Sequence, residues 1–261
     1  MQKAGISTAC FYPLETEKSF DIVCESGCSC TELFFNSPSE ISDGFIKELR
    51  AKQLYHGIDI VSIHPFMSLA ESFYLFSSYE RRFHDIFPLY ERYFEIMNEL
   101  GAKICVIHGL KIPGSISDLL YFERFAKLIE AGKKYGVSVC QENVVHHRAQ
   151  SSEYLRAMTD FIGEDFGIVL DIKQARRAGA DAYDIINSLH KNIKHIHISD
   201  FNDTNDCITP LKGNFDFAHF FSTLKEKGYK GDYIIELYEH SYENIQEIFD
   251  SYSKISKLLI D

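Results

Sequence analysis

The chain has 261 residues, of which 45% are hydrophobic and 25% charged, and it contains no low-complexity run. This composition is ordinary for a globular protein, and the length suits one α/β barrel of about 250 residues. The formal net charge of −11 argues against nucleic acid or an anionic membrane surface as the main partner.

The N-terminal stretch and the cysteines predict where the protein resides. The sequence MQKAGISTACFYPLE lacks the apolar core of a signal peptide, and no stretch approaches the roughly 20 apolar residues of a membrane span. Seven cysteines are scattered along the chain, and the cluster Cys24, Cys28 and Cys30 has no second half at zinc-finger spacing. We therefore expect reduced thiols, a cytoplasmic location and no membrane partner.

Apolar runs and amphipathic segments alternate along the whole chain. Eight strands are predicted, at residues 3–8, 31–35, 58–64, 102–108, 137–143, 166–171, 193–200 and 232–238. Eight helices are predicted after them, at about residues 15–26, 39–55, 79–100, 117–135, 152–162, 175–189, 215–227 and 242–259.

The ends of the helices repeat one signal. Seven helices are followed by a residue that accepts the left-handed conformation, namely Gly27, Gly57, Gly101, Gly136, Gly163, Asn192 and Gly228. Eight strand–helix units without a linker predict one (β/α)8 TIM barrel domain over residues 1–261. A doubly wound sheet would also alternate, but no Gly-rich dinucleotide fingerprint follows the first strand, so no dinucleotide cofactor is expected.

The predicted strand at residues 193–200 carries two histidines. In an extended chain, Ile196 and Ile198 point one way while His195, His197 and Ser199 point the other. The imidazoles then face the barrel interior. His197, nearer the carboxyl end, is a candidate ligand, with a hydrogen-bonded interior histidine as the alternative. We expect His195, one layer deeper, to be a hydrogen-bonded core residue.

Polar residues end six of the predicted strands, at the barrel face where active sites lie. They are His64, His108, Glu142, Asp171, His197 and Glu236. The last four come from adjacent strands and offer three carboxylates and one imidazole, a good shell for Mn²⁺, Mg²⁺, Co²⁺ or Zn²⁺. Without a cation, three crowded carboxylates would repel each other. The alternative is that these side chains pair with lysines or are solvated individually.

These residues give the chain a resemblance to the xylose isomerase-like TIM barrel superfamily, which includes sugar phosphate isomerases/epimerases and AP endonuclease family 2-like proteins. The motifs that carry it are QEN with Glu142, VLD with Asp171, HISD with His197 and Asp200, and IIEL with Glu236. Residues 210–236 are also similar to the family's loop, seventh helix and eighth strand. The resemblance implies that Glu142, Asp171, His197 and Glu236 bind a divalent metal ion.

The resemblance also implies isomerisation or epimerisation of a sugar or sugar phosphate by proton transfer next to a carbonyl. The metal would hold a ketose carbonyl and a neighbouring hydroxyl, which lowers the cost of the enediolate. Glu142 and Glu236 would be an acid/base pair on opposite faces of the reacting carbon. The expected substrate contacts are His64, His108, Gln174, Asp200 and Lys212, and Asn143 and Asp200 are expected to support the ligands. The partner would be a small sugar or polyol, and a homodimer or homotetramer is expected.

Gln174 departs from the family pattern, because many members carry a histidine there. Glutamine cannot carry charge and is a poor metal ligand. The loop at residues 201–214 also lacks histidine. Both features argue against the AP endonuclease branch, whose three-zinc site uses histidines at these places. Two alternatives stay open: a lyase of the inosose dehydratase type, and a catalytically inactive barrel that binds a small molecule.

Other residues near the predicted barrel mouth have two interpretations. Lys212 lies in a loop where barrels often bind phosphate, so it could hold a phosphate or carboxylate, although a solvated loop lysine is the simpler interpretation. Phe11, Tyr12 and Phe66 follow strands and could form an apolar wall against a sugar ring, or they could pack in the core or at its rim.

Overall fold

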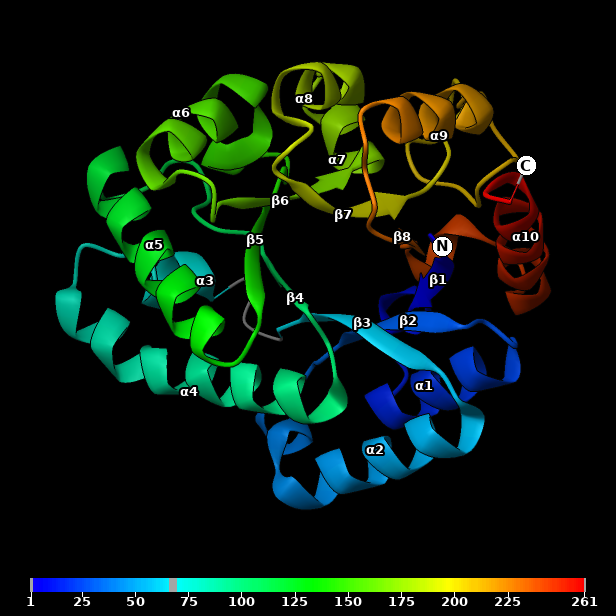
Figure 1. Cartoon of the computed structure of the whole chain (residues 1–261), viewed down its shortest axis with the longest axis horizontal. Coiled ribbons are helices and arrows are strands. Elements are labelled where there is room, and N and C mark those ends of the chain that lie inside the picture. Colours follow the sequence, from blue (N-terminus) through cyan, green and yellow to red (C-terminus); the bar gives the residue numbers. More distant parts are fainter. Residues whose placement is uncertain (1, 66–69, 261) are drawn as a thin grey trace.

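Eight parallel strands pair in chain order and close into a barrel, with β8 against β1. The structure is a computed structural model that describes residues 2–65 and 70–260. Helices surround the barrel as an outer ring (Figure 1). The prediction of a (β/α)8 TIM barrel is confirmed.

The strands are short, and each carboxyl end points to the same face of the barrel. They are β1 (Ala4–Ser7), β2 (Cys30–Phe34), β3 (Asp59–His64), β4 (Ile104–Ile107), β5 (Ser138–Glu142), β6 (Gly167–Asp171), β7 (Ile193–Ile198) and β8 (Tyr233–Ile235). Parallel pairing aligns strand ends, so that Asp171 lies opposite His197 in the register of β6 and β7.

The α-helices follow the predicted order. They are α1 (Thr16–Glu25), α2 (Asp43–His56), α3 (Glu71–Tyr74), α4 (Glu80–Leu100), α5 (Asp118–Lys134), α6 (Ser152–Ile162), α7 (Ile172–Arg177), α8 (Ala182–Leu189), α9 (Phe217–Glu226) and α10 (Ile245–Leu258). Short 3₁₀ turns at Thr8–Phe11, Pro38–Ile41, Arg148–Gln150 and Glu239–Ser241 join them to the strands. Among the helices described, none has the length and apolar character needed to cross a membrane.

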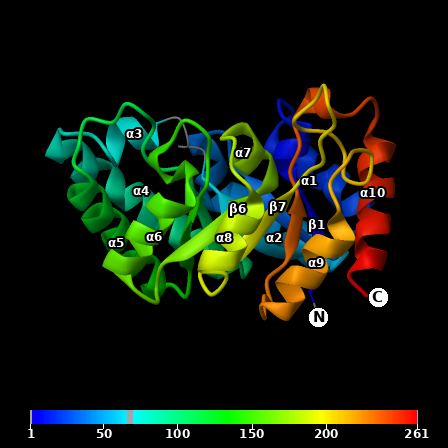
Figure 2. The same ribbon diagram turned by 90° about the horizontal axis from the view of Figure 1, so that it is seen from above.

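The helix predicted at residues 175–189 is two helices, α7 and α8. The Asp171 carboxylate accepts the backbone N–H of Gln174, which starts α7 directly after β6. Gly179 then adopts a positive φ of 69°, and Asp181 caps the start of α8. The short helices α3 and α7 lie along the upper edge of the molecule in Figure 2, above the barrel. Residues 172–174 are thereby placed at the barrel mouth.

The predicted glycine stops have positive φ, whereas the prediction for Asn192 is wrong. Helix α8 ends with His190 in the right-handed region. The Asn192 side chain instead donates to the carbonyl of Phe166, and so ties the turn before β7 to the start of β6. A side-chain hydrogen bond, and not a left-handed residue, therefore holds the turn before β7.

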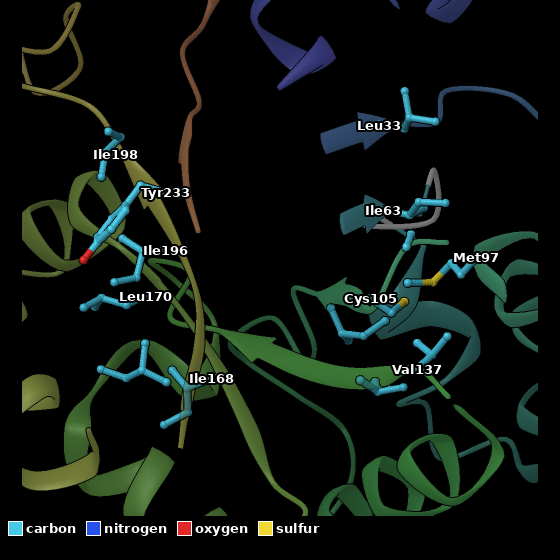
Figure 3. Packing of buried hydrophobic residues seen from close by; sticks show 14 of the residues in the cluster. Leu33, Ile63, Met97, Cys105, Val137, Ile168, Leu170, Ile196, Ile198 and Tyr233 are labelled. Carbon is cyan, nitrogen blue, oxygen red and sulfur yellow. The ribbon is translucent and has the colours of Figure 1, made fainter. Parts of the chain in front are cut away.

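Side chains alternate along β7 as predicted, and those of β6 alternate in the same way. Ile196 and Ile198 lie on the outer side of β7 with Leu170 of β6, packed in the main core between strands and helices (Figure 3). Val169, between two outward residues of β6, belongs to a small apolar cluster inside the barrel with Val106 and Cys140. The inward positions nearer the carboxyl ends are polar, and they build the candidate site.

Candidate functional site

Four predicted ligands from adjacent strands meet at the barrel mouth. Glu142 ends β5, Asp171 ends β6, His197 lies in β7 and Glu236 follows β8 directly. One ligand atom of each lies within 4.8 Å of the others. The first three side chains are buried and Glu236 is partly buried. Adjacent parallel strands therefore bring the predicted set together.

Several atoms of this cluster have no hydrogen-bond partner. His197 Nδ1 is 3.4 Å from Glu142 Oε1 and 3.6 Å from Glu236 Oε2. His197 Nδ1, Glu142 Oε2 and Asp171 Oδ2 are buried and form no hydrogen bond of acceptable geometry, although His108 Nε2 lies 3.0 Å from Glu142 Oε2 and Lys173 Nζ lies 3.1 Å from Asp171 Oδ2. Because buried polar atoms are nearly always partnered, and His197 Nδ1 faces carboxylate oxygens, this side of the cluster points to a bound cation. Carboxylate oxygens and an imidazole nitrogen fit a divalent cation.

The far nitrogen of His197 is held by a residue that the sequence analysis did not single out. Glu32 of β2 is fully buried, and its Oε2 lies 3.0 Å from His197 Nε2. It also accepts hydrogen bonds from Ser7 Oγ at 3.1 Å and Ser62 Oγ at 2.8 Å. When one nitrogen of a histidine binds a metal ion, a carboxylate at the other nitrogen fixes the ring orientation and its tautomer. A glutamate inside the apolar run CTELFF was the available signal.

His195 lies one layer deeper, as predicted. It is 1% exposed, and its Nε2 lies 3.1 Å from Ser62 Oγ and 3.3 Å from Glu32 Oε2. The prediction that His195 is a hydrogen-bonded core residue is confirmed.

The three carboxyl groups of the cluster differ in the direction in which their surroundings shift the pKa. Burial raises the pKa of Glu142, but His108 and His197 outweigh this effect and hold that pKa well below its usual range. Burial raises the pKa of Glu236 less than Lys173 and His197 lower it. For Asp171, burial together with Glu142 and Glu236 outweighs Lys173 and raises the pKa to about 7. Two carboxylates are therefore held ionised, while the third resists ionisation among them.

Lys173 contributes an ammonium group that the sequence analysis also missed. Its side chain is 2% exposed, and its Nζ lies 3.1 Å from Asp171 Oδ2 and 2.8 Å from Glu236 Oε2. The alternative that the carboxylates pair with lysine is therefore realised in part. The residue stands two positions after a strand-end aspartate, in the first turn of α7.

His64 and His108 lie beside Glu142 on the β3 and β4 side of the cluster. Their Nε2 atoms are 2.7 Å apart, and His108 Nε2 is 3.0 Å from Glu142 Oε2. Burial and His108 lower the pKa of His64 to about 4. Burial lowers the pKa of His108, but Glu142 raises it more. A neutral His64 can therefore accept a hydrogen bond while His108 donates.

A cavity of about 450 Å³ opens over this cluster. It is lined by Ala9, Tyr12, Phe34, Asn36, His64, Ala70, His108, Lys173, Gln174, Glu236, Leu237 and Tyr238. Tyr12, 57% exposed, lies at its edge, whereas Phe11 is buried in the core. Phe66 lies outside the described residues. Gln174 faces the cavity, although its Oε1 accepts the backbone N–H of Val145 at 3.2 Å.

Asp200 and Lys212, both expected to contact substrate, do not line the cavity. The buried Asp200 carboxylate accepts backbone N–H groups of Phe201, Gly213 and Phe215, and so folds the loop after β7. Lys212 Nζ lies 2.5 Å from Glu247 Oε2 on α10 and is half exposed. Both side chains therefore bind other parts of the protein: Asp200 binds backbone N–H groups, and Lys212 binds a carboxylate.

Asn143 supports a ligand through the backbone. Its Nδ2 donates to the carbonyl of Asp171 at 3.1 Å, and its Oδ1 accepts the Asp171 N–H at 2.7 Å. This pair of hydrogen bonds fixes the end of β6 beside β5, in agreement with the supporting role expected for Asn143.

Comparisons with known proteins identify the fold and the family. A curated inosose isomerase of Halalkalibacterium halodurans is 29% identical over 174 residues, which cover 58% of this chain and 62% of the relative. A solved D-tagatose 3-epimerase-like protein superimposes with a TM-score of 0.81 at 23% identity, covering 99% of this chain and 97% of its own. The IolI protein with a zinc atom gives a TM-score of 0.79 at 18% identity, covering 99% and 98%. These structural similarities establish the barrel fold.

A family model described as xylose isomerase-like TIM barrel matches residues 20–256. The match includes β2 to β8 and all four residues of the cluster. The chain belongs to the xylose isomerase-like TIM barrel family.

Proposed function

We propose that the protein is a divalent-metal-dependent isomerase or epimerase of a sugar or a related polyol. The observation that carries the proposal is the cluster of Glu142, Asp171, His197 and Glu236, with buried ligand atoms that lack hydrogen-bond partners. The inosose isomerase, the epimerase-like protein and the zinc-containing IolI protein support the reaction class and the need for a metal.

Glu142, Asp171, His197 and Glu236 would hold the ion. When bound, the ion supplies Lewis acidity that makes a neighbouring carbonyl more electrophilic and its adjacent carbon more acidic. Glu32 would keep the His197 ring oriented for this role, because its carboxylate contacts His197 Nε2, the nitrogen that faces away from the ion.

Glu142 and Glu236 would exchange a proton with the substrate carbon. They reach the cluster from β5 and from the end of β8, with β6 and β7 between them. The pKa of each lies below its ordinary value, so both are ionised near neutral pH and can accept a proton. One carboxylate would remove the proton, and the other, after taking up a proton from solvent, would deliver that proton to the opposite face, which inverts the carbon. The first carboxylate then gives its proton to solvent.

The cavity would bind the rest of the substrate. Its volume of about 450 Å³ lies within the range of small-ligand pockets. His64 and His108 would form hydrogen bonds with substrate hydroxyls, and the rings of Tyr12, Phe34 and Tyr238 would pack against the apolar face of a sugar ring.

The proposal is tested by proton exchange in D₂O. Protein loaded with Mn²⁺, Co²⁺ or Zn²⁺ is incubated with a panel of ketohexoses and inososes, and the products are followed by NMR. We expect deuterium at one carbon without loss of water, and no exchange after treatment with a chelator. Loss of water would instead identify a lyase. A panel without any turnover, combined with no metal uptake, would leave only the inactive binding barrel.

Metal content provides a separate test. We expect one ion per chain. Two ions would mean that a second group, either His64, His108 and Glu142 or Glu32, His195 and His197, also holds one, because the ligand atoms of each group lie within 4.8 Å of one another.

A further inference from the structure

Lys173 brings a positive charge to the same oxygens that a metal ion would use. Asp171 Oδ1 already accepts the backbone N–H of Gln174, so Oδ2 is the oxygen left to face the cluster. Lys173 Nζ lies 3.1 Å from that Oδ2. It also lies 2.8 Å from Glu236 Oε2, the atom 3.6 Å from His197 Nδ1. An ammonium group and a divalent cation at these oxygens would repel each other.

The ammonium group also contacts an aromatic ring, in the same position in which it pairs with the two carboxylates. Lys173 Nζ is 4.8 Å from the centre of the Tyr238 ring, and both residues line the cavity. Arg177 Nη1 donates to the Tyr238 hydroxyl at 2.7 Å and is itself paired with Asp206, which fixes the ring. The lysine stem has several rotatable bonds, and a small change in them would separate Nζ from Asp171 Oδ2 while Nζ stays over the Tyr238 ring.

We propose that Lys173 is a positioning residue for Glu236 and an internal competitor of the divalent ion. In protein stripped of metal, the ammonium group keeps Asp171 and Glu236 together and offsets their repulsion. When an ion binds, Nζ gives up Asp171 Oδ2 and keeps its contact with Tyr238 at the cavity wall. Metal affinity is then lower than the four ligands alone would provide. This inference rests on the metal site of the proposed function.

The test compares Lys173→Met, which keeps the apolar stem, with Lys173→Arg, which keeps the charge. Lys212→Met is the matched control, because it removes one ion-paired lysine away from the cluster. Affinity for Co²⁺ and Zn²⁺ is measured by chelator competition at fixed pH, and thermal unfolding is measured after exhaustive chelation.

We expect Lys173→Met to bind the ions at least about tenfold more tightly, since an opposing charge has been removed. Its melting temperature without metal should fall, and added metal should restore it. Lys173→Arg should stay near the parent protein in both measurements, and Lys212→Met should leave affinity unchanged. Lys173→Gln, neutral but polar, should also bind more tightly and replaces the methionine variant if that variant does not fold.

Equal or weaker metal affinity in folded Lys173→Met and Lys173→Gln would overturn the inference while leaving the metal site intact. If neither the parent protein nor these variants bind metal, both the proposed function and this inference fail. If the neutral variants bind metal and the parent protein does not, the result would support the inference that Lys173 competes with the ion.

Discussion

His197 joins two polar clusters that lie in successive layers of the barrel. Its Nδ1 faces the metal cluster, formed with Glu142, Asp171 and Glu236. Its Nε2 faces an inner network of Ser7, Glu32, Ser62 and His195. By spacing alone, Glu32, His195 and His197 could also hold a metal ion. Proximity of ligand atoms therefore does not distinguish the layers.

Hydrogen bonding does distinguish them. Both carboxylate oxygens of Glu32 accept hydrogen bonds from side chains of the inner network. In the metal cluster, one atom each of Glu142, Asp171 and His197 forms no hydrogen bond, and the first two have only ion-pair contacts with His108 and Lys173. A fully satisfied buried network stabilises a fold, whereas several unsatisfied ligand atoms that face one another point to a bound ion. We therefore assign structural support to the inner layer and chemistry to the outer one.

The largest expected effect is at the two proposed acid/base residues. Glu142→Gln and Glu236→Gln should each lower turnover by about a thousandfold, because an amide cannot take up the substrate proton. Turnover is measured as deuterium exchange into the substrate identified by the panel. Ser62→Ala, in the inner network, serves as the control and should stay within a few-fold of the parent. A glutamine variant with more than a tenth of parent activity would contradict this assignment.

Glu32 tests how the inner layer supports the outer one. Glu32→Gln should weaken metal binding by about 10–100-fold, because His197 loses the carboxylate that orients it and increases its basicity. The measurement is chelator competition with Zn²⁺. Glu40→Gln is the control, since Glu40 is a buried carboxylate whose hydrogen bonds go to the backbone N–H groups of Asn36 and Ser37. Unchanged Zn²⁺ affinity in folded Glu32→Gln would mean that the inner layer does not support metal binding in the outer one.

Glu71 is an unsatisfied carboxyl group outside both layers. Its Oε2 accepts the N–H of Gly109 at 2.6 Å, while its buried Oε1 has no partner. Burial raises the pKa of Glu71 from 4.5 to about 8, so the folded protein keeps a proton that the unfolded chain has lost. The resulting stability is fully present below about pH 4.5 and is lost as the pH rises through about 8.

Glu71→Gln should therefore flatten this pH dependence. The variant should match the parent near pH 5 and exceed its free energy of unfolding by on the order of 1–3 kcal/mol at pH 9. Denaturant unfolding across this range provides the measurement. Parallel pH profiles for the two proteins would mean that Glu71 is ionised when folded, and that an orphaned oxygen here, too, points to a ligand.

Ser62→Ala should give the smallest effect. It removes one hydrogen bond to Glu32 and one contact with His195. We expect a loss of about 1–2 kcal/mol in the free energy of unfolding, measured with denaturant. Zn²⁺ affinity should change less than about threefold, since the other contacts of Glu32 remain. A loss of affinity as large as that in Glu32→Gln would show that the serine is part of the metal site's support.

The barrel and the four-residue cluster were predictable because periodic patterns define both. Alternating strands and helices imply the fold, and the fold brings strand ends together. Strand ends do not mark residues inside a strand or in the helix turn that follows it. Glu32 lies within β2 and Lys173 lies in the first turn of α7, so neither was singled out.

Side-chain direction in the long loop after β7 could not be predicted. Asp200 and Lys212 stand at plausible positions, but the loop folds back onto the Asp200 carboxylate through three backbone N–H groups. Gly213 permits this approach, because a Cβ atom there would collide with the Phe201 carbonyl oxygen. Contacts between a side chain and a distant backbone leave no periodic signal in the sequence.

The central claim is that the outer layer binds one divalent ion. Crystals of the protein prepared with Zn²⁺ or Mn²⁺ would be measured at the absorption edge of the metal. We predict one anomalous peak about 2.0–2.2 Å from ligand atoms of Glu142, Asp171, His197 and Glu236. A peak beside Glu32 and His195, or no peak in protein saturated with metal, would contradict the claim.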